Sequence, residues 1–225
     1  MGTLFIIATP IGNLEDITVR ALRILRGVPV IAAEDTRHSR KLLNHYDITA
    51  QLVSYHDHNK QGMTNTLLKM LERGDVAVIT DAGTPCISDP GYELVGRALE
   101  IGAQVDVISG ANAITTALCA SGLPSDGFRF LGFPPRKESQ LKRFLDGVSA
   151  ASETLIFYES PNRLLKTLAI LNEVLGARQA VVAIELTKFF EQFQRGTLPE
   201  LAIFFETNPV RGEVTLLVAG QSSSV

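Results

Sequence analysis

The sequence has no tryptophan and only two cysteines, Cys86 and Cys119, among 225 residues. Two cysteines outside any CxxC spacing exclude a disulfide framework and a cysteine zinc or redox motif, and they fit a reducing cytoplasm. There is also no excess of one charge, because 21 Lys and Arg face 24 Asp and Glu for a net charge of −3. The whole molecule therefore does not attract nucleic acid or an anionic membrane, and a polyanion must bind at a local basic patch.

Long apolar runs and the common nucleotide-binding loops are also missing. No apolar run reaches membrane-spanning length, and the first residues lack the basic flank of a signal peptide. Neither GxGxxG after the first strand nor GxxxxGK[ST] occurs, so ordinary dinucleotide-binding dehydrogenases and P-loop NTPases are not expected. His56 and His58 flank Asp57, but two histidines alone do not make a metal site. We expect a soluble, cytoplasmic protein with no metal and no membrane contact.

Short apolar runs alternate with helical patterns along residues 1–121, which predicts an α/β domain with a mostly parallel sheet. Asp16 is the predicted cap of the first helix, with Ile17, Ala21, Ile24 and Leu25 on one face. The predicted strands are 4–8, 30–33, 52–54, 76–79 and 105–108. Further helices are predicted over residues 40–46, 63–71 and 92–101.

The second half of the chain differs in character. The turn formers over residues 121–127 (SGLPSDG) predict a boundary between domains at 1–121 and 122–220, with a disordered tail at 221–225. The apolar patterns predict a smaller, mixed α/β domain. Its predicted elements are strands over 154–158, 180–184, 189–195 and 213–218, and a helix over 164–175.

Polar or glycine-rich segments directly follow four of the predicted strands, over residues 9–16, 33–37, 80–91 and 109–113. Ligands bind at the carboxyl ends of strands in open α/β sheets, so four such ends side by side predict one pocket. Segment 80–91 is the most informative, because its glycines let the backbone approach a ligand and its prolines fix that geometry. A helix cap remains an alternative for 9–16, and a surface ion-pair cluster for 33–37.

These segments resemble those of the tetrapyrrole methylase superfamily, and more narrowly its 16S ribosomal RNA cytidine 2′-O-methyltransferase branch. The resemblance rests on ATPIGNL at 8–14, AEDTR at 33–37, and DAGTP at 81–85 with SDPG at 88–91. It continues through FYESP at 157–161 with Arg163, and ELTK at 185–188 followed by Glu191 and Arg195-Gly196. It implies two α/β domains with S-adenosylmethionine bound in the cleft between them, a homodimer, and as substrate a cytidine in the decoding region of 16S rRNA in the small ribosomal subunit.

The resemblance also implies a set of cofactor contacts, many made through backbone or apolar surface. By position these are Pro10, Asp81, Ala82, Gly83, Ser88, Asn112, Ala113, Glu159, Leu186 and Thr187. Two positions depart from the family pattern. Residues 109–113 read SGANA where the family usually has Pro-Gly-Pro or Pro-Gly-Ala before Ser-Ala, and Ile184 replaces an arginine before ELTK. The family also commonly carries a further small helical region at its C-terminus.

Methyl transfer from S-adenosylmethionine depends first on how the enzyme positions the acceptor oxygen. A sulfonium methyl is already activated, so holding the acceptor oxygen in line is the main task. A ribose 2′-hydroxyl is a weak acid, so a base or a cation that stabilises the developing alkoxide should help. We predict Glu34 or Asp35 as that base and Lys188 as that cation. The alternative is an ion-pair network that only orients the two halves of the chain.

Contacts with RNA are expected from local basic clusters. The predicted residues are Arg37, Arg40, Lys41, Arg136, Lys137 and Arg163. Phe133 adds an aromatic ring beside the second cluster, whereas Lys142 and Arg143 fit a solvated helix face better. Two other functions remain open at this point: methylation of a small corrin or tetrapyrrole-type molecule, and an inactive S-adenosylmethionine-binding module associated with the ribosome.

Overall fold

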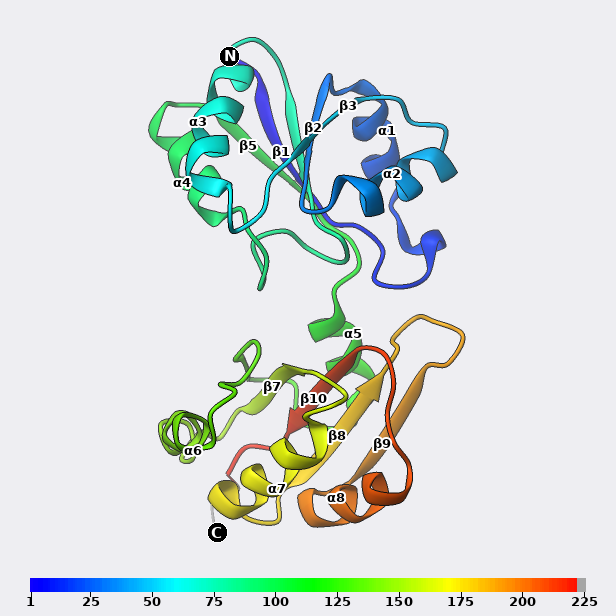
Figure 1. Ribbon diagram of the computed structural model, residues 1–225, viewed down its shortest axis with the longest axis vertical. Helices are drawn as coiled ribbons and strands as arrows, with labels where there is room; N and C mark the ends of the chain where they lie inside the picture. Colours follow the sequence, from blue (N-terminus) through cyan, green and yellow to red (C-terminus); the bar gives the residue numbers. More distant parts are fainter. Residues whose placement is uncertain (222–225) are drawn as a thin grey trace. The chain divides into compact units, whose positions relative to one another are not determined.

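The computed structural model describes residues 1–221 and contains two compact units, Met1–Asn112 (unit 1) and a second from Ala113 onward (unit 2) (Figure 1). Unit 2 begins at Ala113 and not at the predicted residue 122, because helix α5 (Ala113–Ser121) packs on strands of unit 2. Of the predicted tail, residues 222–225 lie outside the described part. The backbone N–H of Gln221 donates a hydrogen bond to the carbonyl of Ala151 (2.7 Å).

Unit 1 is built on a fully parallel five-stranded sheet, as predicted, with the strand order β3-β2-β4-β1-β5. Its central strands are continuous apolar runs, which is typical of strands covered on both faces. The order makes the carboxyl ends of β2, β4, β1 and β5 neighbours at one edge. The strands are β1 (Thr3–Ile7), β2 (Val30–Ala33), β3 (Gln51–Ser54), β4 (Val76–Ile79) and β5 (Gln104–Ile108).

Helices cover both faces of this sheet (Figure 1). Alternation along β1 sends Ile7 into one core with α1 and α2, and Leu4 and Ile6 into the other with α3 and α4. Each core is closed by the apolar stripe of its helices, such as Leu67 and Leu71 of α3. The helices are α1 (Val19–Gly27), α2 (Thr36–His45), α3 (Lys60–Leu71) and α4 (Tyr92–Glu100).

Two helix starts differ from the prediction because other residues cap them. Asp16 ends a short 3-10 helix, η1 (Leu14–Asp16), and the hydroxyl of Thr18 caps α1 by accepting from the N–H of Ala21 (3.0 Å). Helix α2 begins at Thr36 and not at Arg40, because the Asp35 carboxylate accepts from the N–H of Arg37 (2.8 Å). The predicted apolar face of α1 is nevertheless correct.

Unit 2 contains a mixed five-stranded sheet in the order β6-β7-β10-β8-β9, so it is as large as the sheet of unit 1 and not smaller as expected. Strands β6 and β7 are parallel and the other pairs are antiparallel. Helices α6, α7 and α8 close one core on this sheet. The strands are β6 (Phe128–Phe130), β7 (Thr154–Glu159), β8 (Gln179–Ile184), β9 (Gln192–Thr197) and β10 (Val214–Val218), and the helices are α6 (Glu138–Asp146), α7 (Leu164–Leu175) and α8 (Leu198–Thr207).

The segment after β8 contains the main difference from the predicted elements. Strand β9 starts at Gln192, where it pairs with Ile184, and not at Phe189. The residues before it form a loop that leaves the rings of Phe189 and Phe190 in solvent. Helix α8 was not predicted, although Thr197 and Glu200 form a reciprocal capping box that signals a helix start.

Candidate active site

The four segments that follow strands of unit 1 contact one another. Thr9, after β1, and Gly83, after β4, exchange two backbone hydrogen bonds (2.9 and 3.1 Å). The segment after β2 joins them, because the N–H of Asp35 donates to the Asp81 carboxylate (3.1 Å). The segment after β5 joins through the Asn112 amide, which donates to the Thr84 hydroxyl (3.3 Å).

This cluster contains most of the predicted cofactor contacts, namely those at Pro10, Asp81, Ala82, Gly83, Ser88 and Asn112. Gly83 suits its position because its φ of 81° disfavours a side chain. The backbone is packed more tightly at Gly110, where an added Cβ would lie 3.0 Å from Cβ of Ala8. The backbone at these strand ends is therefore packed tightly and held in one geometry.

Unfavourable backbone conformations concentrate in two loops. Among the described residues, five non-glycine residues have positive φ. Cys86 and Ser88 (72° and 64°) lie in the loop after β4, and Glu185 and Thr187 (50° and 64°) lie in the loop after β8. Both loops carry motifs singled out in the sequence. Such conformations cost about 1–3 kcal/mol each and cluster at functional sites, so they support a role for both loops.

Two carboxyl groups of unit 1, Glu34 and Asp89, have raised pKa values, and Asp81 lies close to both. Burial, followed by repulsion from Glu34 and Asp81, raises the pKa of Asp89 from 3.8 to about 7. Burial, followed by repulsion from Asp81, also raises the pKa of Glu34 above its ordinary value. Asp89 was not among the predicted catalytic residues. Its position in the SDPG run, after a buried strand and beside two prolines, was the signal that could have identified it.

Asp35 lies in a different environment from its neighbour Glu34. Its carboxylate oxygens accept from Nε and Nη2 of Arg37 (3.2 and 2.8 Å) and from the N–H of Arg37 at the start of α2. These hydrogen bonds hold the pKa of Asp35 far below its ordinary value. A carboxylate stabilised in this way is a weak base, so of the two predicted bases the structure favours Glu34.

Lys188 lies between two carboxylates in unit 2. Its Nζ is 2.9 Å from Oε1 of Glu185 and 2.9 Å from Oε2 of Glu213, and Oε1 of Glu185 also accepts from the N–H of Glu213 (2.8 Å). Burial lowers the pKa of Lys188, but the two hydrogen-bonded carboxylates outweigh it and raise that pKa. The ammonium is therefore fixed and charged at neutral pH. The adjacent predicted contacts are Leu186, which is buried, and Thr187, whose N–H donates to Glu191 (2.6 Å).

Glu159, a predicted cofactor contact, is fully buried at the end of β7. One carboxylate oxygen accepts from the N–H of Ser160 (2.7 Å) and the other from the hydroxyl of Thr167. Nε of Arg163 lies 3.5 Å from this carboxylate, and its Nη2 donates to the carbonyl of Pro134 (2.8 Å). Glu159 therefore fixes Arg163 and, through it, the loop that precedes α6.

The predicted basic residues fall into two groups. Arg136 and Arg163 line one pocket of about 480 Å³ in unit 2 together with Phe133 and Lys166. Lys137 is exposed beside them at the start of α6. The others lie in unit 1, on the exposed side of α2: Arg37, Arg40 and Lys41. Lys142 forms ion pairs with glutamates at 138 and 173, in agreement with a solvated helix face.

The structure offers no cluster of three or more metal-ligating side chains within residues 1–221. His56 and His58 contact each other edge to face, with ring centroids 5.9 Å apart, and Nδ1 of His56 is buried without a hydrogen-bond partner. No helix in the described part is long and apolar enough to cross a membrane.

Comparison with known proteins places the chain among methylases. The profile of the Tetrapyrrole (Corrin/Porphyrin) Methylases matches residues 3–202. The chain is 50% identical to the ribosomal RNA small subunit methyltransferase I of Halalkalibacterium halodurans, over all of this chain and 78% of that protein. It is 43% identical to the protein of the same name from Thermotoga maritima, over 98% of this chain and 100% of that protein.

Solved structures of lower identity have the same fold. A diphthine synthase superposes with a TM-score of 0.75 at 12% identity, over 99% of this chain and 91% of the other. A uroporphyrin-III-C-methyltransferase from Thermus thermophilus superposes with a TM-score of 0.66 at 21% identity, over 97% and 94%. These similarities confirm the predicted fold class.

Proposed function

This chain belongs to the tetrapyrrole methylase family and is a methyltransferase, and from that premise we propose that it methylates ribosomal RNA of the small subunit with S-adenosylmethionine as methyl donor. The observation that carries the proposal is that relatives half identical over the whole chain are named for this substrate. The acceptor that we propose is the 2′-oxygen of a cytidine in the decoding region. In this proposal the enzyme acts in the cytoplasm as a homodimer. Light scattering of the purified protein tests whether it is a dimer.

The strand-end cluster of unit 1 fits the methyl donor. S-adenosylmethionine carries a sulfonium and an ammonium, and Asp81 and Asp89 supply negative charge close to where the loops meet. Its adenosine has hydrogen-bonding edges and an apolar face, which suit the backbone groups of tightly packed positions such as Gly110. When bound, S-adenosylmethionine supplies a methyl group that is already activated for transfer. We propose that Pro10, Asp81, Ala82, Gly83, Ser88 and Asn112 bind it, and that Ala113, Glu159, Leu186 and Thr187 are further cofactor contacts.

The remaining steps belong to side chains of the protein. Glu34 accepts the proton that the ribose hydroxyl loses, because its raised pKa makes it a stronger base than Asp35. Lys188 stabilises negative charge on the acceptor oxygen, since its ammonium stays protonated and is held by Glu185 and Glu213. Asp35 is a positioning residue: its carboxylate caps the start of α2 and holds the guanidinium of Arg37 in place.

Contact with RNA is proposed for the pocket that holds Arg136 and Arg163. Phe133 is 62% exposed there and its ring centroid lies 5.6 Å from that of Tyr158. Guanidinium groups bind phosphates and exposed aromatic rings stack on unpaired bases, so this combination suits single-stranded RNA. Arg37, Arg40 and Lys41 provide a second basic surface on α2, and Lys137 extends the first.

The decisive experiment is methyl transfer from radiolabelled S-adenosylmethionine to small ribosomal subunits that lack the modification. Mapping by resistance to alkaline hydrolysis should locate the label on one cytidine 2′-oxygen. Glu34→Gln is the matched control, because it keeps the size of the side chain and removes the base. Calorimetry should show S-adenosylmethionine binding by both proteins. Cofactor binding without transfer to RNA would instead favour a small-molecule acceptor or an inactive binding module.

A further inference from the structure

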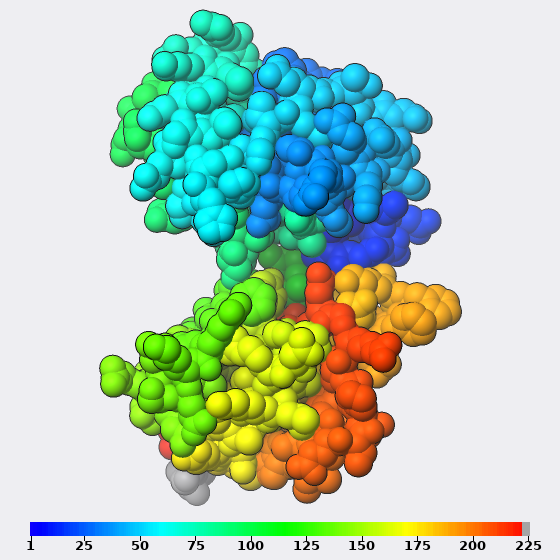
Figure 2. Space-filling view, viewed as in Figure 1, coloured from blue at the N-terminus to red at the C-terminus, as the bar shows by residue number. Residues whose placement is uncertain are grey.

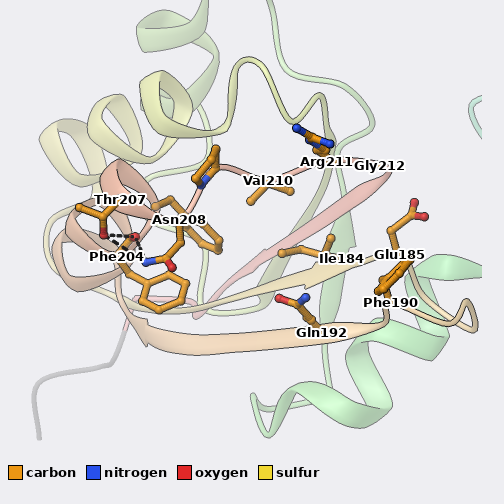
Figure 3. A pocket seen from close by; sticks show the side chains of 12 residues that line it. Ile184, Glu185, Phe190, Gln192, Phe204, Thr207, Asn208, Val210, Arg211 and Gly212 are labelled. Atoms are coloured by element: carbon orange, nitrogen blue, oxygen red, sulfur yellow. Dashed lines mark hydrogen bonds between the residues drawn. The ribbon is translucent and has the colours of Figure 1, made fainter.

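A second pocket, of about 510 Å³, lies in unit 2 away from the residues assigned above to RNA contact. It opens between the loop that joins β8 to β9 and the segment that joins α8 to β10 (Figure 3). Figure 2 shows both segments on one face of unit 2, with the gold β8–β9 loop standing out from the surface. The volume is within the usual range of about 300–1,000 Å³ for small-molecule sites.

Two aromatic rings stand at opposite ends of this pocket. Phe190 is 69% exposed and Phe204 is 38% exposed, while Ile184 and Val210 lie between them (Figure 3). Phenylalanine rings left in water lose the stabilisation that burial would give them. Their exposure around one concave surface therefore points to a flat, apolar-faced ligand that stacks on a ring.

Polar groups complete the lining. The side-chain amide of Gln192 and the guanidinium of Arg211 form no hydrogen bond or ion pair within residues 1–221. The Asn208 amide donates to the carbonyl of Phe204 (2.8 Å), which fixes the side chain and leaves its oxygen as an acceptor. Glu185 is the one acid among the lining residues, and its carboxylate shares Lys188 with Glu213 (2.9 Å each). The pocket therefore presents amide groups and an arginine that has no ion-pair partner within residues 1–221.

We propose that this pocket binds one unpaired nucleotide of a single-stranded RNA segment, with the base stacked on Phe204 and the phosphate at Arg211. Aromatic rings, side-chain amides and an arginine are the groups that proteins use to hold splayed-out bases. The inference rests on the proposed function, since it deepens the way in which the same RNA substrate is held. A second copy of the chain is the less favoured occupant, because an apolar partner would leave the guanidinium and the amides unpaired.

The test measures the affinity for a fluorescently labelled oligocytidylate by anisotropy at several salt concentrations. Phe204→Ala should weaken binding roughly 5- to 150-fold, the range for loss of one base–aromatic stack. Arg211→Glu should also weaken binding, and losing one phosphate contact should reduce the salt slope by about 0.7. Phe204→Leu keeps an apolar side chain but no ring, so it should fold normally and still bind less tightly.

Two matched control variants separate the loss of a pocket contact from a general change in surface apolarity or net charge. Ile203→Ala removes an exposed apolar side chain beside Phe204 that does not line the pocket. Arg23→Glu changes net charge by the same amount as Arg211→Glu, on an exposed position of α1 in unit 1. Both controls should bind oligocytidylate as the unchanged protein does.

The outcomes separate this inference from the proposed function. If the unchanged protein methylates small subunits but the Phe204 and Arg211 variants bind RNA normally, the pocket inference is wrong and the function stands. If the variants lose RNA affinity while no protein methylates the subunits, the pocket stands and the function is wrong. Absence of oligocytidylate binding by the unchanged protein, or variants that change only the oligomeric state in light scattering, overturns the pocket inference.

Discussion

Gly212 lies directly against the carboxylate of Glu185, so closely that a Cβ atom at position 212 would be 2.6 Å from Cγ of Glu185. The φ of Gly212 is 85°, which also disfavours any side chain. The same carboxylate accepts from Lys188 and from the N–H of Glu213. Absence of a side chain at 212 therefore allows the carboxylate to hold Lys188 in its position.

We expect Gly212→Ala to lower the free energy of unfolding by about 1–3 kcal/mol, because it combines an unfavourable φ with displacement of the Glu185 side chain from its hydrogen bonds to Lys188 and Glu213. It should also reduce methyl transfer by displacing Lys188. Gly176→Ala is the matched control, since Gly176 has a similar φ of 78° but no atom within 4 Å of its Cβ position. Urea unfolding of both variants should show the smaller loss for Gly176→Ala, and equal losses would contradict the steric argument.

Glu34→Gln should reduce kcat by about 10²–10⁴-fold with S-adenosylmethionine affinity unchanged, because a base is lost and the packing is kept. Asp35→Asn should have the smaller effect on kcat, since Arg37 already makes that carboxylate a weak base. The base must be ionised, so kcat of the unchanged protein should fall as pH decreases through the raised pKa of Glu34. A larger loss of kcat in Asp35→Asn would reverse the assignment.

Asp89 should make the protein less stable as pH rises. Its pKa is about 7 in the folded protein against an ordinary value of 3.8, so between these values the folded state binds more protons than the unfolded state. The free energy of unfolding therefore falls between about pH 4 and pH 7 through this group. At pH 8 we expect Asp89→Asn to be more stable than the unchanged protein by about 1–3 kcal/mol, allowing for partial exposure.

Thermal or urea unfolding at pH 5 and pH 8 checks this prediction. The advantage of Asp89→Asn should shrink at pH 5, where the carboxyl of the unchanged protein is largely protonated. Asp16→Asn, on an exposed position of η1, serves as the control and should show no comparable dependence. An advantage that is equal at the two pH values would show that the effect does not come from titration of Asp89.

Arg163 and Glu159 should contribute to stability together. Arg163→Met leaves the buried Glu159 carboxylate with only Ser160 and Thr167 as partners, so we expect a loss of about 2–4 kcal/mol. Glu159→Gln in the same chain should recover about 1–2 kcal/mol of it, because the unpaired charge is removed. A double-mutant cycle in urea measures this coupling.

The exposed pair of Arg129 and Glu153 (2.9 Å) is the reference for that cycle. Arg129→Met should cost less than about 1 kcal/mol, as is usual for ion pairs in solvent. If Arg163→Met lowers the free energy of unfolding no more than Arg129→Met does, then the burial of Glu159 does not make its ion pair with Arg163 more stabilising than a pair in solvent.

Local patterns were sufficient for most elements of the fold. The strand at 76–79 and the helix at 164–175 were predicted at their observed bounds, because a continuous apolar run and a 3.6-residue stripe each match one structure. Errors arose where a side-chain hydrogen bond sets a boundary. The carboxylate of Asp35 starts α2 four residues before its apolar pattern, and the Thr197 capping box starts a helix that the pattern did not show.

The sequence by itself determined the alternation of strands and helices, the parallel sheet of unit 1 and the family, because these depend on periodicity and on motifs read in order. Only the tertiary structure decided which charged groups differ in basicity. Glu34 and Asp35 are neighbours in sequence, yet burial beside Asp81 raises the pKa of the first, and Arg37 lowers that of the second. The pocket at Phe204 and Arg211 likewise required the tertiary structure, since packing alone brings the loop after β8 against the segment after α8.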